Sequence, residues 1–132
     1  MNPITSMSLE IFGNTYELLT YNIRFSQSTI TNSGKPNDIP TPDSLYVEIV
    51  SDRENDFVEW MLEHDKEQDG EIIFKVGNKV VKTISFSGAF LVGYSQNPGT
   101  ANGGVQITED LTISFKELDF SGAKYERPEI WS

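Results

Sequence analysis

The segment from Trp60 to Gly70 contains the residues whose types and spacing could support chemistry, WMLEHDKEQDG. It holds the only histidine, His64, and carboxylates at alternate positions, Asp65, Glu67 and Asp69. An imidazole beside a carboxylate can transfer protons in general acid–base catalysis. Alternating carboxylates followed by a glycine begin a calcium-binding loop. The segment therefore suggests either a proton-transfer site or a metal site, or it is only the end of a helix.

As a calcium loop, the segment lacks the ligand that completes the coordination. Asp65, Glu67 and Asp69 would fill positions one, three and five, but position twelve, which needs a bidentate carboxylate, is Val76. The residues just before it, 72–75, have the pattern of a strand instead of the second helix of such a motif. We predict a solvated acidic turn after a helix, and no metal site.

His64 also lacks what a general base requires. It falls in the last turn of an expected helix, where a partly charged imidazole interacts favourably with the helix dipole. No nucleophile or orienting partner is evident, and the sequence contains no GxGxxG, GxxxxGK[ST] or GxSxG motif. We therefore predict that the protein is not an enzyme and that it binds no cofactor.

Composition limits the classes of protein that remain. The length of 132 residues suits a single domain, residues 1–132. A net charge of -10 argues against nucleic acid and against anionic membranes. There is no apolar run of the roughly 18 residues that span a bilayer, and no signal-peptide pattern at the start. We expect a soluble protein made in the cytoplasm that leaves the cell only through a signal-independent machine.

Alternation of apolar and polar residues, typical of half-buried strands, dominates the sequence. Gly13-Asn14 and Gly77-Asn78 suit tight hairpin turns, and Gly88 and Gly93 are expected bends. About seven strands joined by turns favour a mainly β fold, an antiparallel barrel or sandwich. Three sets of residues are each expected to share a face: Leu19, Tyr21, Ile23 and Phe25; Phe90, Val92 and Tyr94; and Leu111, Ile113 and Phe115.

One helix is predicted, over residues 52–65, because Phe57, Trp60, Met61 and His64 recur at helical spacing. The first three are expected to anchor the helix in the core and to cover one end of the sheet. The candidate N-cap residues are Ser51, Asp52 and Asn55, and Ser51 with Glu54 could form a capping box.

Two stretches have no periodic pattern. Residues 26–43 are rich in Ser, Thr, Asn, Gly and Pro, and so long a connection between strands is usually functional. Residues 95–104, SQNPGTANGG, are predicted as a second flexible loop.

Several segments together resemble the Bacteroidetes branch of the type VI secretion tube protein family, Hcp or TssD. They are FSQSTITNSGKP, LYVEIVSDRENDFVEWML, GEIIFKV, KTISFSGAFLVGYSQ and LTISFKELDF, and the likeness extends from about Leu9 to Trp131. The resemblance implies a closed antiparallel β-barrel of two packed sheets with one flanking helix and an extended loop. It also implies hexameric rings that stack head to tail into a tube, which a contractile sheath drives out of the cell.

Interface roles are expected for particular residues, some because of their outward position on a strand and others because the resemblance implies them. Outward residues Tyr46 and Leu91, with Trp131 near the end of the chain, are candidate subunit contacts. The ring-stacking contacts would come from the 26–43 loop, through Ser28, Thr31, Gly34, Lys35, Pro36, Asp38 and Pro40. The partners would be further copies of the chain together with the sheath, the baseplate or spike, and effectors carried in the ring lumen.

Three other functions remain open at this point. One is a monomeric barrel or sandwich that binds a small molecule or glycan through Tyr, Trp and the long loops. Another is a hydrolase with paired carboxylates. The third is a tube subunit of a phage tail or related injection particle, which has the same architecture in a different machine.

Overall fold

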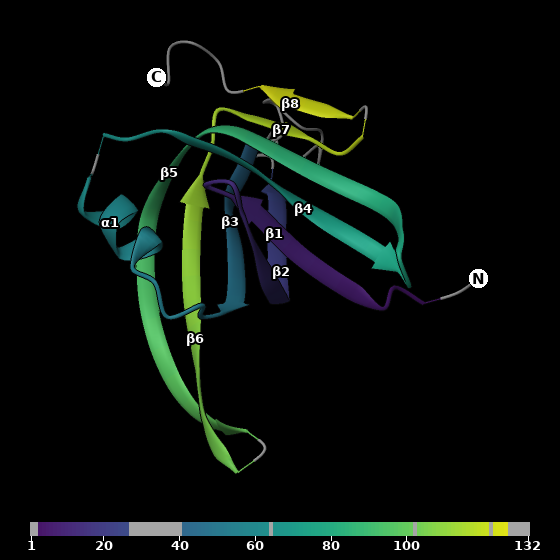
Figure 1. Cartoon of the computed structure of the whole chain (residues 1–132). Helices are drawn as coiled ribbons and strands as arrows, with labels where there is room; N and C mark the ends of the chain where they lie inside the picture. Colours follow the sequence, from purple (N-terminus) through teal and green to yellow (C-terminus); the bar gives the residue numbers. More distant parts are fainter. Residues whose placement is uncertain (1–2, 27–40, 64, 102, 122, 127–132) are drawn as a thin grey trace, which may run out of the picture.

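The computed structural model describes residues 3–26, 41–63, 65–101, 103–121 and 123–126. Within these ranges it contains eight strands and one helix (Figure 1). Their bounds are β1 Ser6–Ile11, β2 Asn14–Ser26, β3 Thr41–Val50, α1 Asp56–Leu62, β4 Gln68–Val76, β5 Lys79–Ala101, β6 Gly104–Ser114, β7 Glu117–Asp119 and β8 Lys124–Glu126.

Backbone pairing links six strands into a closed ring, in the order β4-β1-β2-β3-β6-β5, and the β4–β5 pairing closes it. Every pairing is antiparallel. One sheet contains β1, β4, β7, β8 and the first parts of β2 and β5. The second contains β3, β6 and the later parts of β2 and β5. The predicted closed barrel of two packed sheets is confirmed.

The two long strands turn the corners between the sheets, and each does so at an irregularity in the pairing. In β2 the register shifts between Leu18 and Thr20. A bulge adds one residue, so the side chains beyond it change faces. Leu18 is therefore buried and Leu19 is 39% exposed, whereas Tyr21 packs on the core after the shift. The prediction that Leu19 shares a face with Tyr21 was therefore wrong.

A bulge also changes the faces of the side chains along part of β5. Its register shifts between Leu91 and Gly93, at one of the expected bends. Leu91 is 6% exposed and Val92 is 54% exposed, whereas Tyr94, beyond the bulge, again packs against the core. The assignment of Leu91 to an outward subunit contact was wrong: before the bulge Leu91 shares the buried face with Ala89, and the bulge changes the faces only of the residues after it. Gly88, with a φ of 59°, is the other confirmed bend.

Both predicted hairpins form, one of them one residue earlier than expected. Ile11 pairs with Asn14, so the first turn consists of Phe12 and Gly13, with φ values of 59° and 75°. Phe12 is held there by ring contacts with Phe57 and Trp60, at centroid distances of 5.2 and 5.7 Å. At the second hairpin Val76 pairs with Lys79 around Gly77-Asn78, as predicted.

The helix is shorter than the predicted 52–65 because the chain before it is not helical. Arg53 has a φ of 73°, which a right-handed helix does not allow. Ser51 Oγ accepts a hydrogen bond from the Arg53 N–H, and Asp52 Oδ1 accepts one from the Glu54 N–H. These side chains stabilise local turns, so the capping box is absent. Asn55 occupies the N-cap position without a side-chain hydrogen bond to the helix.

Two of the three expected helix anchors are buried. Phe57 and Trp60 are 2% and 3% exposed, and the Trp60 indole donates a hydrogen bond of 2.8 Å to the carbonyl of Lys66. Met61 is 36% exposed, so its assignment as a core anchor was wrong. A helix of only seven residues turns one narrow face to the barrel, and Met61 lies at the edge of that face.

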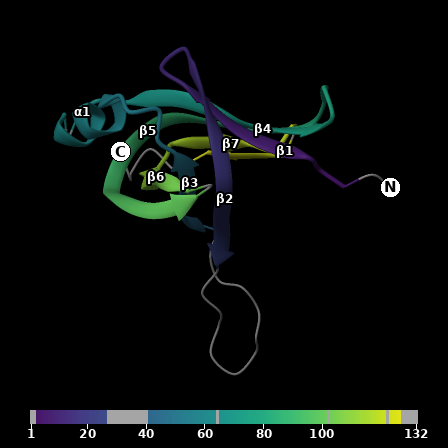
Figure 2. The same cartoon turned by 60° about the horizontal axis from the view of Figure 1, so that its bottom comes forward.

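The predicted loop over residues 95–104 is mostly strand. β5 continues to Ala101 and pairs with β6 from Gly104, so the two strands form a ribbon that extends beyond the barrel (Figure 1). Figure 2 turns this part of the molecule toward the viewer. We call residues 95–107 the arm. Of the predicted 26–43 loop, Ser26 belongs to β2 and pairs with Thr41 of β3, and residues 27–40 lie outside the described residues. No helix in the described ranges is long and apolar enough to cross a membrane.

Candidate functional site

The carboxylates of the acidic segment have separate partners in the structure. Glu67 forms an ion pair with Lys116, and Asp69 accepts a hydrogen bond of 3.0 Å from the N–H of Gly88. Asp65 is exposed, and His64 lies outside the described residues. Across the part of the chain that the structure describes, no group of three His, Cys, Asp or Glu residues could hold a metal ion. Glu67 and Asp69 serve to attach the start of β4 to neighbouring segments.

A single polar side chain is fully buried among the described residues, that of Glu109 in β6. Its Oε1 accepts a hydrogen bond of 2.5 Å from the hydroxyl of Tyr94 in β5, and its Oε2 has no hydrogen-bond partner in the described structure. Burial, followed by this hydrogen bond, raises the pKa of Tyr94 to about 12. Because Glu109 is inaccessible to solvent, the pair joins two strands and cannot meet a substrate.

The outer face of the second sheet has a polar network centred on Asp110. The hydroxyl of Tyr46 donates a hydrogen bond of 3.0 Å to its Oδ1, and Ser95 Oγ and Asn97 Nδ2 donate to its Oδ2 at 3.2 and 2.5 Å. These residues come from three adjacent strands, β3, β6 and β5. Tyr46 is 37% exposed, so this predicted contact residue is accessible to another molecule.

The described surface hollows are lined by residues of several strands. One of them has a volume of about 520 Å³ and lies over β1, β4 and β5 beside the β1–β2 turn. Its polar side chains include three acids and two serines, Glu10, Asp69, Glu71, Ser85 and Ser87. The carboxylate of Asp69 already accepts a hydrogen bond from the N–H of Gly88.

Exposed apolar side chains form the more informative feature, and the sequence pattern did not predict most of them. Val105 and Ile107 on the arm are 73% and 42% exposed. Val80 and Val81 follow the β4–β5 turn and are 49% and 48% exposed, and Leu62 at the end of α1 is 77% exposed. The alternation of Val105 and Ile107 with polar residues was a usable sign of a strand, but the glycines before it indicated a loop.

Of the other predicted contact residues, the structure describes only Leu91. Leu91 is buried, as described above. Trp131 and the loop residues Ser28, Thr31, Gly34, Lys35, Pro36, Asp38 and Pro40 lie outside the described residues.

Comparison with known proteins agrees with this picture. The sequence matches the family described as Hemolysin coregulated protein Hcp (TssD) over residues 5–131. No curated protein matches it significantly. The fold is similar to that of Hcp1 from Flavobacterium johnsoniae, with a TM-score of 0.83 and 23% identity over 93% of this chain and 100% of the other.

Two more distant structures share the same fold. One is a type VI secretion system effector from Yersinia pestis, with a TM-score of 0.68 and 15% identity over 91% of this chain and 98% of the other. Another is a chain of the anti-feeding prophage baseplate, with a TM-score of 0.59 and 13% identity over 92% of this chain and 97% of the other.

Proposed function

The chain belongs to the Hcp (TssD) family and is a structural tube protein of the type VI secretion type, and from this premise we propose that its copies form hexameric rings that stack head to tail. The observation that carries the proposal is the match over residues 5–131, which includes every strand that the structure describes. The remaining support comes from surfaces of this chain that a monomer would leave unpaired.

The barrel closes through the β1–β2 and β4–β5 pairings, and beyond these pairings β2 and β5 each leave one edge of the second sheet unpaired. From Leu18 onward β2 pairs only with β3, and from Phe90 onward β5 pairs only with β6, as far as the described residues show. Exposed strand edges present unpaired N–H and C=O groups to other chains. Contact between two unlike edges is heterologous, and a constant rotation between copies closes such contacts into a ring. These edges are therefore suited to side-by-side assembly.

The arm supports assembly for a different reason. A two-stranded ribbon is marginally stable alone in water, and this one exposes Val105 and Ile107. Contact with a neighbouring subunit would bury both side chains and hold the ribbon. We propose that the arm is covered by another copy in the assembled tube.

The 26–43 loop keeps its proposed role in stacking one ring on the next, through the seven residues named in the sequence analysis. The expected partners outside the ring are the sheath, the baseplate or spike, and effectors in the lumen. The protein would be made in the cytoplasm and exported by the secretion apparatus, with neither catalysis nor nucleic-acid binding.

Native mass spectrometry with negative-stain electron microscopy of the purified protein tests the proposal. We expect hexamers and rings of uniform diameter. A protein that stays monomeric at every concentration overturns the proposal and favours a monomeric ligand-binding barrel. A variant in which residues 28–40 are replaced by a short Gly-Ser linker should form single rings that no longer stack.

A second candidate is a tube subunit of a phage-tail-like injection particle, favoured by the likeness to the anti-feeding prophage baseplate chain. Both candidates form rings. Export of the protein that stops when the membrane complex of a type VI system is deleted would support the first, and release only inside free particles would support the second.

A further inference from the structure

The β4–β5 hairpin is basic on a protein that is strongly acidic overall. Residues 75–82, KVGNKVVK, contain three lysines and no acid, whereas the whole chain has a net charge of -10. We call these residues the basic hairpin. Lys75, Lys79 and Lys82 form no ion pair with any residue that the structure describes. Lys82 lies over the ring of Phe74, with its Nζ 5.6 Å from the centroid.

The basic hairpin is also apolar, and it adjoins an apolar hollow. Val80 and Val81 are each about half exposed. The hollow has a volume of about 410 Å³, and Phe74, which pairs with Lys82, forms part of its lining. Its other apolar residues are Ile4, Met7, Leu18 and Tyr21, and its polar lining consists of Thr5, Ser6 and one carboxylate, that of Glu17. Such a surface suits a partner that carries carboxylates around an exposed apolar side chain.

The helix end of the same molecule has those properties. Residues 52–71 include nine acidic residues and two basic ones. On α1 itself Leu62 is 77% exposed, beside the exposed carboxylates of Glu59 and Glu63. Glu63 has only a loose ion pair of 3.8 Å with Lys66. We call α1 with Glu63 the acidic helix end.

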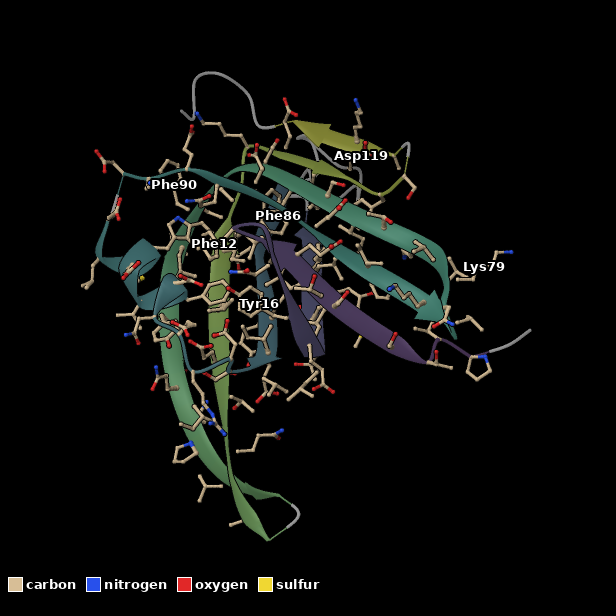
Figure 3. The ribbon with its side chains drawn as sticks, in the orientation of Figure 1. Phe12, Tyr16, Lys79, Phe86, Phe90 and Asp119 are labelled. Atoms are coloured by element: carbon tan, nitrogen blue, oxygen red, sulfur yellow. The ribbon has the colours of Figure 1, made fainter. Side chains whose placement is uncertain are left out.

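The two surfaces face opposite directions on the barrel. Figure 1 places α1 at one side, and Figure 3 shows Lys79 at the tip of the basic hairpin on the other side. One molecule therefore cannot bring them together, but two copies placed side by side can.

We propose that the acidic helix end of one copy docks on the basic hairpin of the next copy around the ring. Leu62 would pack against Val80 and Val81 at the mouth of the apolar hollow, with the carboxylates of Glu59 and Glu63 facing the lysines. The contact rests on the proposed ring assembly and specifies which surfaces form it. Charge complementarity of this kind fixes the orientation of a contact and excludes like surfaces from pairing.

The position of each surface in the fold agrees with the free edges of the second sheet. The acidic helix end packs against β5, which provides one free edge. The hollow beside the basic hairpin includes Leu18 and Tyr21 of β2, which provides the other. A copy that meets its neighbour edge to edge therefore brings the helix end toward the hairpin.

Cysteine crosslinking tests the contact directly, because the natural sequence contains no cysteine. A protein with Leu62→Cys and Val81→Cys is treated with a short bismaleimide. We expect a ladder of covalent oligomers that ends at the closed ring. The control carries Leu62→Cys and Lys124→Cys; Lys124 is also exposed but lies on β8, outside the proposed contacts, so this pair should crosslink much more slowly.

The outcomes separate this inference from the proposed function. If native mass spectrometry shows rings but the 62–81 pair crosslinks no faster than the control, the docking contact is wrong and the tube function stands. If no oligomer exists under any condition, both are wrong.

Charge exchange provides an independent test. Lys79→Glu with Lys82→Glu should raise the concentration at which rings dissociate by about tenfold or more at low salt. Glu59→Lys with Glu63→Lys should do the same. A chain that carries all four changes restores opposite charges across the contact, so it should recover assembly. If rings of the chain with all four changes are no more stable than those of either double variant, the two surfaces do not meet.

Discussion

The hydroxyl of Tyr94 donates a hydrogen bond of 2.5 Å to Oε1 of Glu109, the only fully buried carboxylate that the structure describes. The two residues lie on the paired strands β5 and β6, next to the residues 95–107 that form the arm. Oε2 of Glu109 has no partner within the described structure. A buried carboxylate is costly unless it is hydrogen-bonded, so the position of Glu109 depends on this tyrosine.

Replacing Tyr94 with Phe should lower the free energy of unfolding by about 1–3 kcal/mol, because the buried carboxylate then loses its donor. Urea denaturation measures the change. The control adds Glu109→Met, which removes the carboxylate as well and should recover part of the loss. If Tyr94→Phe alone is neutral, the hydrogen bond does not support the fold.

The same tyrosine predicts a dependence on alkaline pH. Burial raises the pKa of Tyr94 from 10.0 to about 12, so between these values the folded protein keeps a proton that the unfolded chain loses. The free energy of unfolding should therefore fall as the pH rises through this window. Burial also raises the pKa of Tyr16 and Tyr46, so Tyr94→Phe should reduce the fall without abolishing it. Urea denaturation across the window measures both slopes, and equal slopes would contradict the assignment.

The contribution of α1 to the free energy of unfolding should come mainly from its buried aromatic residues and little from Met61. Phe57→Ala removes a ring that contacts Phe12 and Tyr16 and should cost about 3–5 kcal/mol. Met61→Ala removes a side chain at the edge of the contact and should cost less than about 1 kcal/mol. Chemical denaturation of both variants checks the difference, and similar losses would show that Met61 packs as tightly as Phe57.

Gly70 is predicted to tolerate no side chain. A Cβ there would lie 2.6 Å from Cζ of Phe86 and 3.0 Å from the backbone oxygen of Glu10. Gly70→Ala should therefore cost about 1–3 kcal/mol, because the buried Phe86 ring must move. At Gly99 in the arm the nearest atom is 3.9 Å away, so Gly99→Ala should change stability by less than about 0.5 kcal/mol. Thermal denaturation that ranked the two variants equally would refute the clash.

Polar substitutions on the arm should separate stability from assembly. Val105→Ser with Ile107→Ser alters side chains that are already exposed in the monomer, so the free energy of unfolding should change by less than about 0.5 kcal/mol. Ring or tube formation should nevertheless weaken, because apolar burial against a neighbour is lost. Light scattering across a concentration series measures the assembly, and unaltered assembly would mean that no copy covers the arm.

The sequence by itself determined the class of fold and most of its local elements. The alternation at Leu111, Ile113 and Phe115 predicted a half-buried strand, and all three side chains are buried. Gly77 marked a hairpin because a positive φ is easy for glycine, and the turn is there. The order of segments also indicated the Hcp family, because a resemblance over the whole chain does not depend on the exact position of any one side chain.

Only the tertiary structure decided which face of the barrel a side chain takes where β2 and β5 pass from one sheet to the other. It also decided which charged side chains are buried or lie far from opposite charges. Leu91 and Leu19 were placed on the wrong faces because bulges form just after them, where β5 and β2 pass between sheets. Gly93 marked a bend in the sequence, but it did not show that the side-chain faces reverse there. The glycines and asparagines of 95–104 indicated a loop, but pairing with β6 drew most of them into a strand. Burial of Glu109, and the separation of the basic hairpin from the acidic helix end, likewise depend on contacts between segments that are distant in the chain. Local propensity acts over a few residues, whereas these features follow from how the barrel closes.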